Sequence, residues 1–369
     1  MEMRRNSKAV FAAPALFATL VVFSLSGCNV AEEAKTTDVK ITNASIRSIS
    51  ASGSTAIQPL IDRWGKDYEK SHPMEVNYRP TGSGAGIENL RHGYGAFAAS
   101  DAPLADNQLA GLPAIIQIPV TAGPVCIAYN LPGLKAPLRL SGATLAGIFS
   151  SEIISWQDAA IARENPGVAL PHQAIIVVHR ADGSGTTKIL SSYLSKVSPA
   201  WESKLGVGLS VKWPAGIAVS GSSAEAKAIL ETPGTIGYIE LTFARTSGLT
   251  VASIQNKAGE WTAPTPETAY AAEVAADELL ARDLRAVIVD PPATAKGAYP
   301  ITGITFILIP KDNTSSDGEQ KALKEYIDYT LTTGQDSAGE LSYAKLPDSV
   351  QKAAEGLLSQ LTDNGKAIQ

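Results

Sequence analysis

The fold and the candidate site both depend on the stretch Arg180-Ala181-Asp182-Gly183-Ser184-Gly185-Thr186-Thr187. An apolar run at residues 175–178 precedes it and predicts a buried strand, and residues 188–194 predict the body of a helix. The glycines permit a tight turn, and a helix that begins here presents unpaired backbone N–H groups and a positive dipole end. With Arg180 beside those donors, the stretch predicts an anion site. An ordinary strand–turn–helix connection with a Ser or Thr N-cap has the same composition.

Two other segments repeat this arrangement of strand, small polar residues and helix. Residues 52–55, Ser-Gly-Ser-Thr, follow a predicted strand at 46–49 and precede a helical pattern with Pro59 in its first turn. One apolar face of that helix consists of Ile57, Leu60, Ile61, Trp64 and Tyr68. Residues 81–86, Thr-Gly-Ser-Gly-Ala-Gly, follow residues 76–78 and lead into a short helix at 87–91. Three such junctions predict that several helix N-termini converge on one anion.

Further motifs between about residues 48 and 357 resemble those of the PstS family, the phosphate-binding proteins of bacterial ABC phosphate importers. They occur in the order typical of that family. Besides the stretch at Arg180, they are Val76-Asn77-Tyr78 with Gly82-Ser83, Ala99-Ser100-Asp101-Ala102-Pro103-Leu104, Asn130-Leu131-Pro132-Gly133-Leu134, Val211-Lys212-Trp213-Pro214, Gly234-Thr235-Ile236-Gly237-Tyr238, Pro300-Ile301-Thr302 with Thr305-Phe306-Ile307-Leu308, and Leu346-Pro347-Asp348-Ser349-Val350.

The alternation of short apolar strands with helical patterns predicts an α/β protein, with strands at 115–119, 125–129, 175–178 and 236–239. The resemblance implies a two-lobed, type II periplasmic-binding-protein fold, with the ligand cleft between lobes joined by two crossover strands. Those crossovers fall near residues 118–123 and 301–308. Lobe one then contains residues 48–119 plus 304–369, and lobe two contains residues 120–303.

The resemblance also implies a set of phosphate ligands, transferred position by position. They are Thr55, Ala56, Ser83, Asp101, Arg180, Ser184, Gly185 and Thr186, with Asp182 behind Arg180 to orient and partly neutralise it. Hydroxyls and backbone N–H groups suit a dehydrated tetrahedral oxyanion, because they stabilise it without adding a large buried charge.

Asp101 is the unusual member of this set, because a carboxylate repels an anion unless that anion carries a proton. Monobasic and dibasic phosphate both have a P–OH group that can donate to Asp101, whereas fully ionised sulfate has none. An Asx turn before Pro103 is a second, compatible role for Asp101. The sequence departs from the usual family pattern at Ala56, where an aromatic residue is common, and at Gly84, where a second serine is common.

The N-terminal residues predict export. Arg4, Arg5 and Lys8 precede an uncharged apolar stretch that ends in Leu25-Ser26-Gly27-Cys28, a pattern typical of a lipoprotein signal at residues 1–27. Cys28 then receives the lipid, palmitate included, and residues 28–47 form a polar tether. A transmembrane anchor with an incidental cysteine is the alternative. Cys126 lies in an apolar run and is expected to be a buried, unpaired thiol.

Composition limits the classes of function. The chain has 31 Lys and Arg against 36 Asp and Glu, a formal net charge of -5, which argues against a nucleic-acid surface. A nucleotide-binding enzyme is disfavoured because Gly183 to Lys188 lacks the ending of a P-loop, and a hydrolase or phosphatase because no Gly-x-Ser-x-Gly elbow occurs. His179 is expected to be a strand residue whose ring points away from Ser184, and no histidine shows metal-ligand spacing.

The sequence therefore predicts a monomeric phosphate receptor that is not an enzyme and uses neither a metal nor a cofactor. Its expected partners are inorganic phosphate, the permease and ATPase of an ABC importer, and a membrane reached through the lipid. A lipid-anchored phosphate sensor or store, which signals to a partner without transport, is the alternative from another class.

Overall fold

The computed structural model describes residues 48–134, 137–313 and 318–368. The predicted signal peptide, Cys28 and the tether lie outside these residues. Among the residues described, no helix has the length and apolar character needed to cross a membrane.

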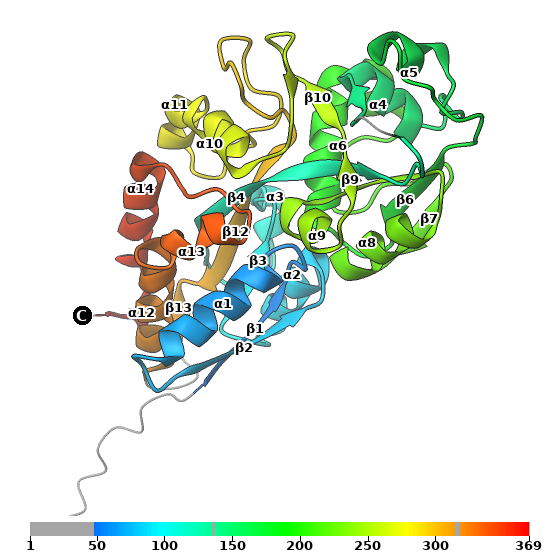
Figure 1. Cartoon of the computed structure of the whole chain (residues 1–369). Coiled ribbons are helices and arrows are strands. Elements are labelled where there is room, and N and C mark those ends of the chain that lie inside the picture. Colours follow the sequence, from blue (N-terminus) through cyan, green and yellow to red (C-terminus); the bar gives the residue numbers. More distant parts are fainter. Residues whose placement is uncertain (1–47, 135–136, 314–317, 369) are drawn as a thin grey trace, which may run out of the picture. The chain divides into compact units, whose positions relative to one another are not determined.

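A nine-stranded sheet positions the candidate site, with strand order β2-β1-β3-β12-β4-β8-β6-β7 and β9 paired to β4 (Figure 1). Its strands are β1 (Ser48–Gly53), β2 (Glu75–Pro80), β3 (Phe97–Ser100), β4 (Ile115–Tyr129), β6 (Ile176–Arg180), β7 (Ile217–Val219), β8 (Thr235–Glu240), β9 (Thr250–Val251) and β12 (Thr302–Pro310). Two small sheets consist of β5 (Arg139–Leu140), β10 (Ser253–Gln255) and β11 (Trp261–Thr262), and of β13 (Asp312–Asn313), β14 (Thr362–Asp363) and β15 (Lys366–Ala367).

The main sheet contains two parallel groups of strands. β1 pairs parallel with β2 and β3, and β6 pairs parallel with β7 and β8. Between the groups, β4 and β12 pair antiparallel with each other, from Thr302 opposite Pro124 to Pro310 opposite Ile115. β12 also pairs with β3, and β4 with β8, so these two crossover strands connect the groups.

Helices follow most strands of the parallel groups. They are α1 (Gln58–Glu69), α2 (Ser83–Arg91), α3 (Asp106–Leu109), α4 (Gly142–Phe149), α5 (Ala159–Glu164), α6 (Gly185–Val197), α7 (Pro199–Lys204), α8 (Ser222–Glu231), α9 (Leu241–Thr246), α10 (Pro266–Val274), α11 (Asp277–Arg282), α12 (Glu319–Leu331), α13 (Gln335–Glu340) and α14 (Asp348–Leu358). The apolar face predicted for the first helix is buried on α1, including Trp64 and Tyr68, and Pro59 lies in its first turn.

Separate hydrophobic cores support the two groups. The first contains Trp64, Phe97, Phe306 and Tyr326 from α1, β3, β12 and α12. The second contains Trp156, Tyr193, Trp201, Tyr238 and Tyr299. Ala269, Ala276, Leu280 and Ile288, from α10, α11 and their flanking loops, pack in the first core although their sequence lies inside 120–303. The boundaries assigned above to the two lobes stay a prediction.

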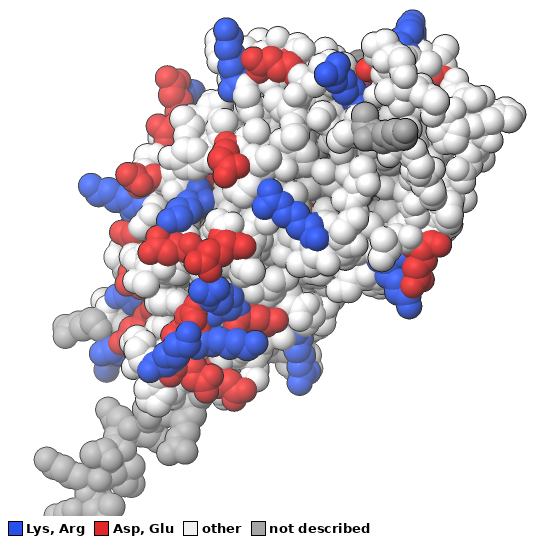
Figure 2. Space-filling model, in the orientation of Figure 1, with Lys and Arg blue, Asp and Glu red and all other residues white. Residues whose placement is uncertain are grey.

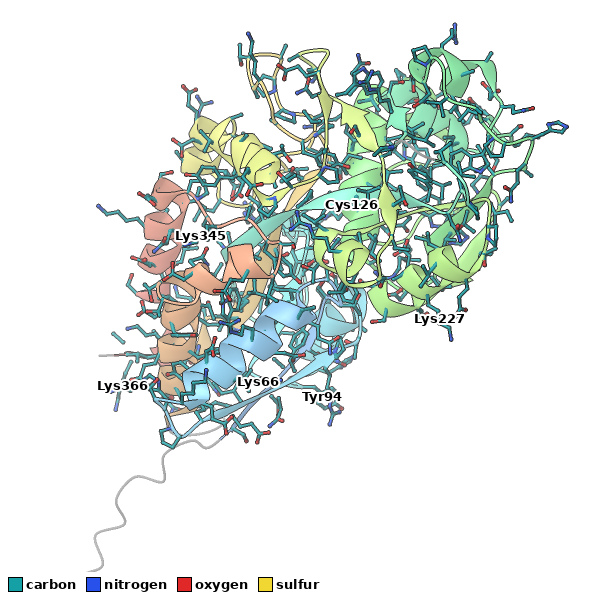
Figure 3. The ribbon with its side chains drawn as sticks, in the orientation of Figure 1. Lys66, Tyr94, Cys126, Lys227, Lys345 and Lys366 are labelled. Atoms are coloured by element: carbon teal, nitrogen blue, oxygen red, sulfur yellow. The ribbon has the colours of Figure 1, made fainter. Side chains whose placement is uncertain are left out.

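One expectation about the strands is wrong. Residues 115–119 and 125–129 were expected to be separate strands, but they form the single strand β4. Pro119 and Pro124 both lie within the antiparallel pairing with β12. The register shift between Thr305 and Phe306 leaves Val120 unpaired, next to Pro119. Cys126 is fully buried on β4 with a free thiol, as expected (Figure 3).

Candidate functional site

Four helices begin where parallel strands end, and their first residues meet. α1 and α2 follow β1 and β2, whereas α6 and α8 follow β6 and β7. The N-cap residues of α2, α6 and α8 are Gly82, Ser184 and Gly221, and the hydroxyl of Ser184 accepts the N–H of Thr187 at 3.2 Å. Helix N-termini attract anions through their N–H groups and dipoles, so this junction suits an oxyanion.

Arg180 is the buried cation of the junction, with 4% of its surface exposed. Asp182 accepts a hydrogen bond from Nε of Arg180 at 2.7 Å and a second from Nη2 of Arg180 at 2.5 Å. Burial alone would lower the pKa of Arg180, but the hydrogen bond and charge of Asp182 outweigh it and raise that pKa. Asp182 in turn accepts the N–H of Gly221 at 3.1 Å, and its own pKa is lowered because the contacts with Arg180 outweigh burial. The guanidinium is therefore charged and fixed in direction.

Thr55 joins the two sides of the site. Its Oγ1 accepts Nη2 of Arg180 at 3.2 Å and the backbone N–H of Ser222 at 3.1 Å, and it lies 2.7 Å from Oγ of Ser222. The neighbouring Ala56 is buried, and its N–H donates to Oγ of Ser54 at 3.0 Å. The backbone N–H at position 56 is thus bonded to Ser54 in this structure, and its role as a ligand donor stays a prediction.

The carboxylate of Asp101 is buried at the end of β3 with 4% exposure. Its Oδ2 accepts Oγ of Ser54 at 2.5 Å, and its Oδ1 accepts Oγ1 of Thr305 at 3.0 Å. Burial raises the pKa of Asp101 to about 7, and the negative charge of Glu240 adds to the rise, while the two hydroxyl donors and Arg180 oppose it. The register shift next to Thr305 on β12 lies beside this contact, and such bulges redirect side chains at functional sites.

Close backbone contact between the two sides explains two glycines. The N–H of Gly84 donates to the carbonyl of Gly183 at 2.8 Å, and a Cβ on Gly84 would lie 3.1 Å from Cα of Gly183. A serine at position 84 would crowd this contact, so the missing hydroxyl is replaced by direct contact between the two segments. The space at Gly185 is smaller still, because a Cβ there would lie 2.7 Å from Oγ of Ser83. The same Oγ accepts the N–H of Gly185 at 3.2 Å.

Thr186 completes the predicted set and is 1% exposed. Its hydroxyl donates to Oε1 of Glu240, the last residue of β8. A second carboxyl group, that of Glu225 on α8, is fully buried near Arg180, and burial raises its pKa well above the ordinary value.

All eight predicted ligand positions and Asp182 thus lie at one junction, but sequence reasoning missed four side chains there. Ser222 could have been found, because Gly221-Ser222 repeats the pattern of small polar residues before a helix. Ser54 lies in the segment at residues 52–55, but no ligand or hydrogen-bonding role was predicted for it. Thr305 lies in a quoted motif that gave it no role at the site, and Glu240 belongs to no motif. Tertiary contacts alone bring Glu240 beside Thr186 and Thr305 beside Asp101. His179 stacks on Trp213, with ring centroids 5.3 Å apart.

The face drawn in Figure 2 carries charges of both signs. On the face drawn in Figure 2, positive and negative side chains lie intermixed, mainly over the region of α1 and α12 to α14. Intermixed charges produce little long-range field, so this face offers little attraction for a distant anion.

Comparison with known proteins gives a consistent result. The model of the PBP superfamily domain matches residues 33–333. A phosphate-binding protein PstS of Xylella fastidiosa (strain Temecula1 / ATCC 700964) is 41% identical over 310 residues, which cover 83% of this chain and 84% of the relative. A phosphate-binding protein PstS of Methanocaldococcus jannaschii is 34% identical, with 82% and 84% covered.

Solved structures show the same fold at lower identity. A phosphate-binding protein from Stenotrophomonas maltophilia is 21% identical with a TM-score of 0.62, covering 84% of this chain and 93% of that chain. A high-affinity periplasmic phosphate-binding protein, PfluDING, solved with phosphate bound, is 20% identical with a TM-score of 0.65, covering 85% and 93%. The chain therefore has the two-lobed type II fold of periplasmic binding proteins.

Proposed function

Because this chain belongs to the PstS family of phosphate-binding proteins, we propose that it captures inorganic phosphate outside the cytoplasm and delivers it to an ABC importer. The family consists of substrate-binding receptors and not of enzymes. The ligands of the phosphate are the eight residues predicted above, and Ser222 joins them as a further donor.

The observation that carries this function is the pairing of one fixed cation with one buried carboxyl group at a junction of helix N-termini. Arg180 and the donors around it attract an oxyanion. Asp101 accepts hydrogen bonds from two hydroxyls and lies in the same junction, so it can take a P–OH proton that sulfate does not have. Together they bind an oxyanion only when it carries a proton.

Delivery to a transporter requires a receptor whose shape depends on its ligand. The ligand residues come from both groups of strands. The donors Thr55 and Ser83 and the acceptor Asp101 belong to one group, and Arg180 to Thr186 belong to the other. A ligand that contacts both groups favours their closed arrangement. The closing movement takes place between these two groups, and α10 and α11 move with the first group because they pack in its core.

The location and the anchor rest on the sequence. A signal at residues 1–27 and a lipidated Cys28 would hold a monomeric receptor at the membrane that contains the importer. A lipid-anchored sensor or store would use the same binding chemistry, and its distinguishing property would be a partner other than an importer permease.

The test is calorimetric titration of the protein without residues 1–28, stripped of bound phosphate, with phosphate, sulfate and arsenate. We expect tight phosphate binding and no response to sulfate. Asp101→Asn should gain sulfate affinity by at least about tenfold relative to phosphate, because the like charge is removed. The same change at the exposed Asp336 serves as control. Equal selectivity in Asp101→Asn and wild type would contradict the role of Asp101.

A further inference from the structure

Lys188 is a half-buried cation near the site to which neither the sequence motifs nor the ligand set gives a role. It lies on α6, one turn after Ser184, and its Nζ donates to the backbone carbonyl of Pro103 at 2.9 Å. Burial lowers the pKa of its ammonium, and no carboxylate among the residues that the structure describes offsets that effect. A partly buried ammonium without a counter-ion carries a desolvation cost, which the hydrogen bond to Pro103 reduces.

The hydrogen bond of Lys188 joins the two groups of strands. Its helix α6 follows β6, and Leu190 and Leu194 of that helix pack in the second core. Pro103 follows β3 of the first group, two residues after Asp101. Because a hydrogen bond of this kind is lost when donor and acceptor separate beyond about 3.5 Å, it exists only while the two groups lie as close together as they do here.

The residues on either side of Pro103 are fixed within the first group. The carbonyl of Ala102 accepts Oγ of Ser100 at 2.7 Å. The side chain of Gln117 on β4 accepts the N–H of Leu104 at 2.8 Å and donates to the carbonyl of Leu104 at 3.0 Å. The carbonyl of Pro103 therefore projects from a loop that the first group holds in place, and it accepts a donor from the second group.

This contact differs from the others that cross between the groups beside the anion. Arg180 and Thr55, which also bond to each other across the groups, are both predicted ligands, so phosphate competes for or reinforces their contact. Lys188 and Pro103 are not in the ligand set, yet they line one cavity of about 20 Å³ together with Asp101. Their hydrogen bond lies next to the site and can act on closure without contacting phosphate.

We propose that Lys188 is a latch between the two groups, whose hydrogen bond to Pro103 favours the closed arrangement and so slows the release of phosphate. Because Gly185 and Thr186 begin the same helix, the bond also holds these ligands close to the loop after Asp101. A contact made only in the closed arrangement shifts the equilibrium toward it, with or without ligand. Lys188 is a positioning residue, and the inference rests on the proposed function.

The first experiment measures the rates of phosphate binding and release, by stopped-flow tryptophan fluorescence of the protein without residues 1–28. Lys188→Met removes the donor and keeps the length of the side chain. Its dissociation rate should rise about tenfold, the factor that a hydrogen bond from a charged group contributes, and its association rate should stay within about twofold of wild type. A lower association rate with an unchanged dissociation rate would mean that the lysine charge attracts the anion, which overturns the latch.

Lys196 provides a matched control on the same helix. Its Nζ also donates to a backbone carbonyl, that of Val289 at 2.8 Å, but Val289 packs in the second core with α6. Lys196→Met should therefore leave both rates unchanged, and a rise equal to that of Lys188→Met would overturn the inference. Lys188→Arg keeps a charged donor and should release phosphate within about threefold of the wild-type rate. If Lys188→Met does not fold, the shorter side chain of Lys188→Gln should give the faster release.

The second experiment tests the latch in protein stripped of phosphate. Spin labels attached after Tyr94→Cys and Ile154→Cys report the distance between the two groups, because both positions are exposed and the native thiol of Cys126 is fully buried. Lys188→Met should shift the distance distribution toward that of a more open protein, and Lys196→Met should not. Identical distributions in Lys188→Met and wild type would overturn the inference. If wild type binds no phosphate, the proposed function fails, and the distances still test the latch.

Discussion

Gly185→Ala should prevent the two sides of the site from meeting. Gly185 is the first residue of α6, and its Cβ would lie 2.7 Å from Cβ of Asp101, 2.7 Å from Oγ of Ser83 and 2.8 Å from the backbone nitrogen of Asp101. Ordinary contacts between such atoms begin near 3.5 Å. One methyl group therefore requires the two sides to separate by roughly 1 Å.

That separation breaks the contacts that cross the site. The Gly185 N–H to Ser83 hydrogen bond and the Arg180 to Thr55 hydrogen bond are both 3.2 Å long, and an added 1 Å places them beyond hydrogen-bonding range. A neutral bond contributes about 1 kcal/mol and one from a charged group about 2 kcal/mol. Their combined loss of about 3 kcal/mol corresponds to a phosphate affinity lowered about hundredfold.

The assay is phosphate titration by calorimetry together with the thermal midpoint of the stripped protein. Gly356→Ala is the matched control, because Gly356 is exposed on α14 and its Cβ would meet nothing within 4 Å. The control should raise stability by about 0.5–1 kcal/mol and leave affinity unchanged. Phosphate affinity of Gly185→Ala within about threefold of wild type would refute the close contact described here.

Two further predictions concern stability. Gly53→Ala should lower the free energy of unfolding by about 3 kcal/mol or more, because Gly53 has φ 143° and its Cβ would lie 2.2 Å from the carbonyl oxygen of Ala99; a thermal midpoint equal to that of wild type would contradict this. Burial raises the folded-state pKa of Asp101 to about 7, above its unfolded value, so the folded chain holds this proton longer and loses stability as pH rises from about 4 to 7. Asp101→Asn should remove that loss, up to about 4 kcal/mol, and its midpoint in the stripped protein should exceed that of wild type more at pH 8 than at pH 4. A constant difference across this range would show that Asp101 ionises normally in the folded chain.

Sequence patterns were sufficient to predict the parts of the candidate site that local chain geometry forms. The strand–turn–helix junctions at Ser54, Ser83 and Ser184 could be read from small polar residues between an apolar run and a helical pattern. Their convergence follows because the two groups of strands run in opposite directions toward each other. β3 ends at Ser100 opposite Phe306, and β8 ends at Glu240 opposite Val125, so both groups end near the middle of the β4–β12 pair. The same reasoning would have located Ser222, had the pattern at Gly221 been recognised.

Local patterns failed where pairing partners decide the outcome. Residues 115–119 and 125–129 read as two strands, but pairing with β12, which lies far away in the sequence, joins them into the single strand β4. Glu240 likewise looks like an ordinary strand end. Only the placement of α6 against β8 shows that its carboxylate receives the proton of Thr186.

The pairing of β4 with β12 has a consequence for how often the receptor can be reused. Two separate linkers would leave the relative orientation of the two strand groups unrestrained. Here the two connecting strands are hydrogen-bonded to each other from Thr302 to Pro310, which restricts how the groups can move. Each half of the anion site therefore remains at a high effective concentration with respect to the other. In the closing movement proposed above, the contact between Gly84 and Gly183 would re-form as an intramolecular event, because β4 and β12 keep the two segments joined.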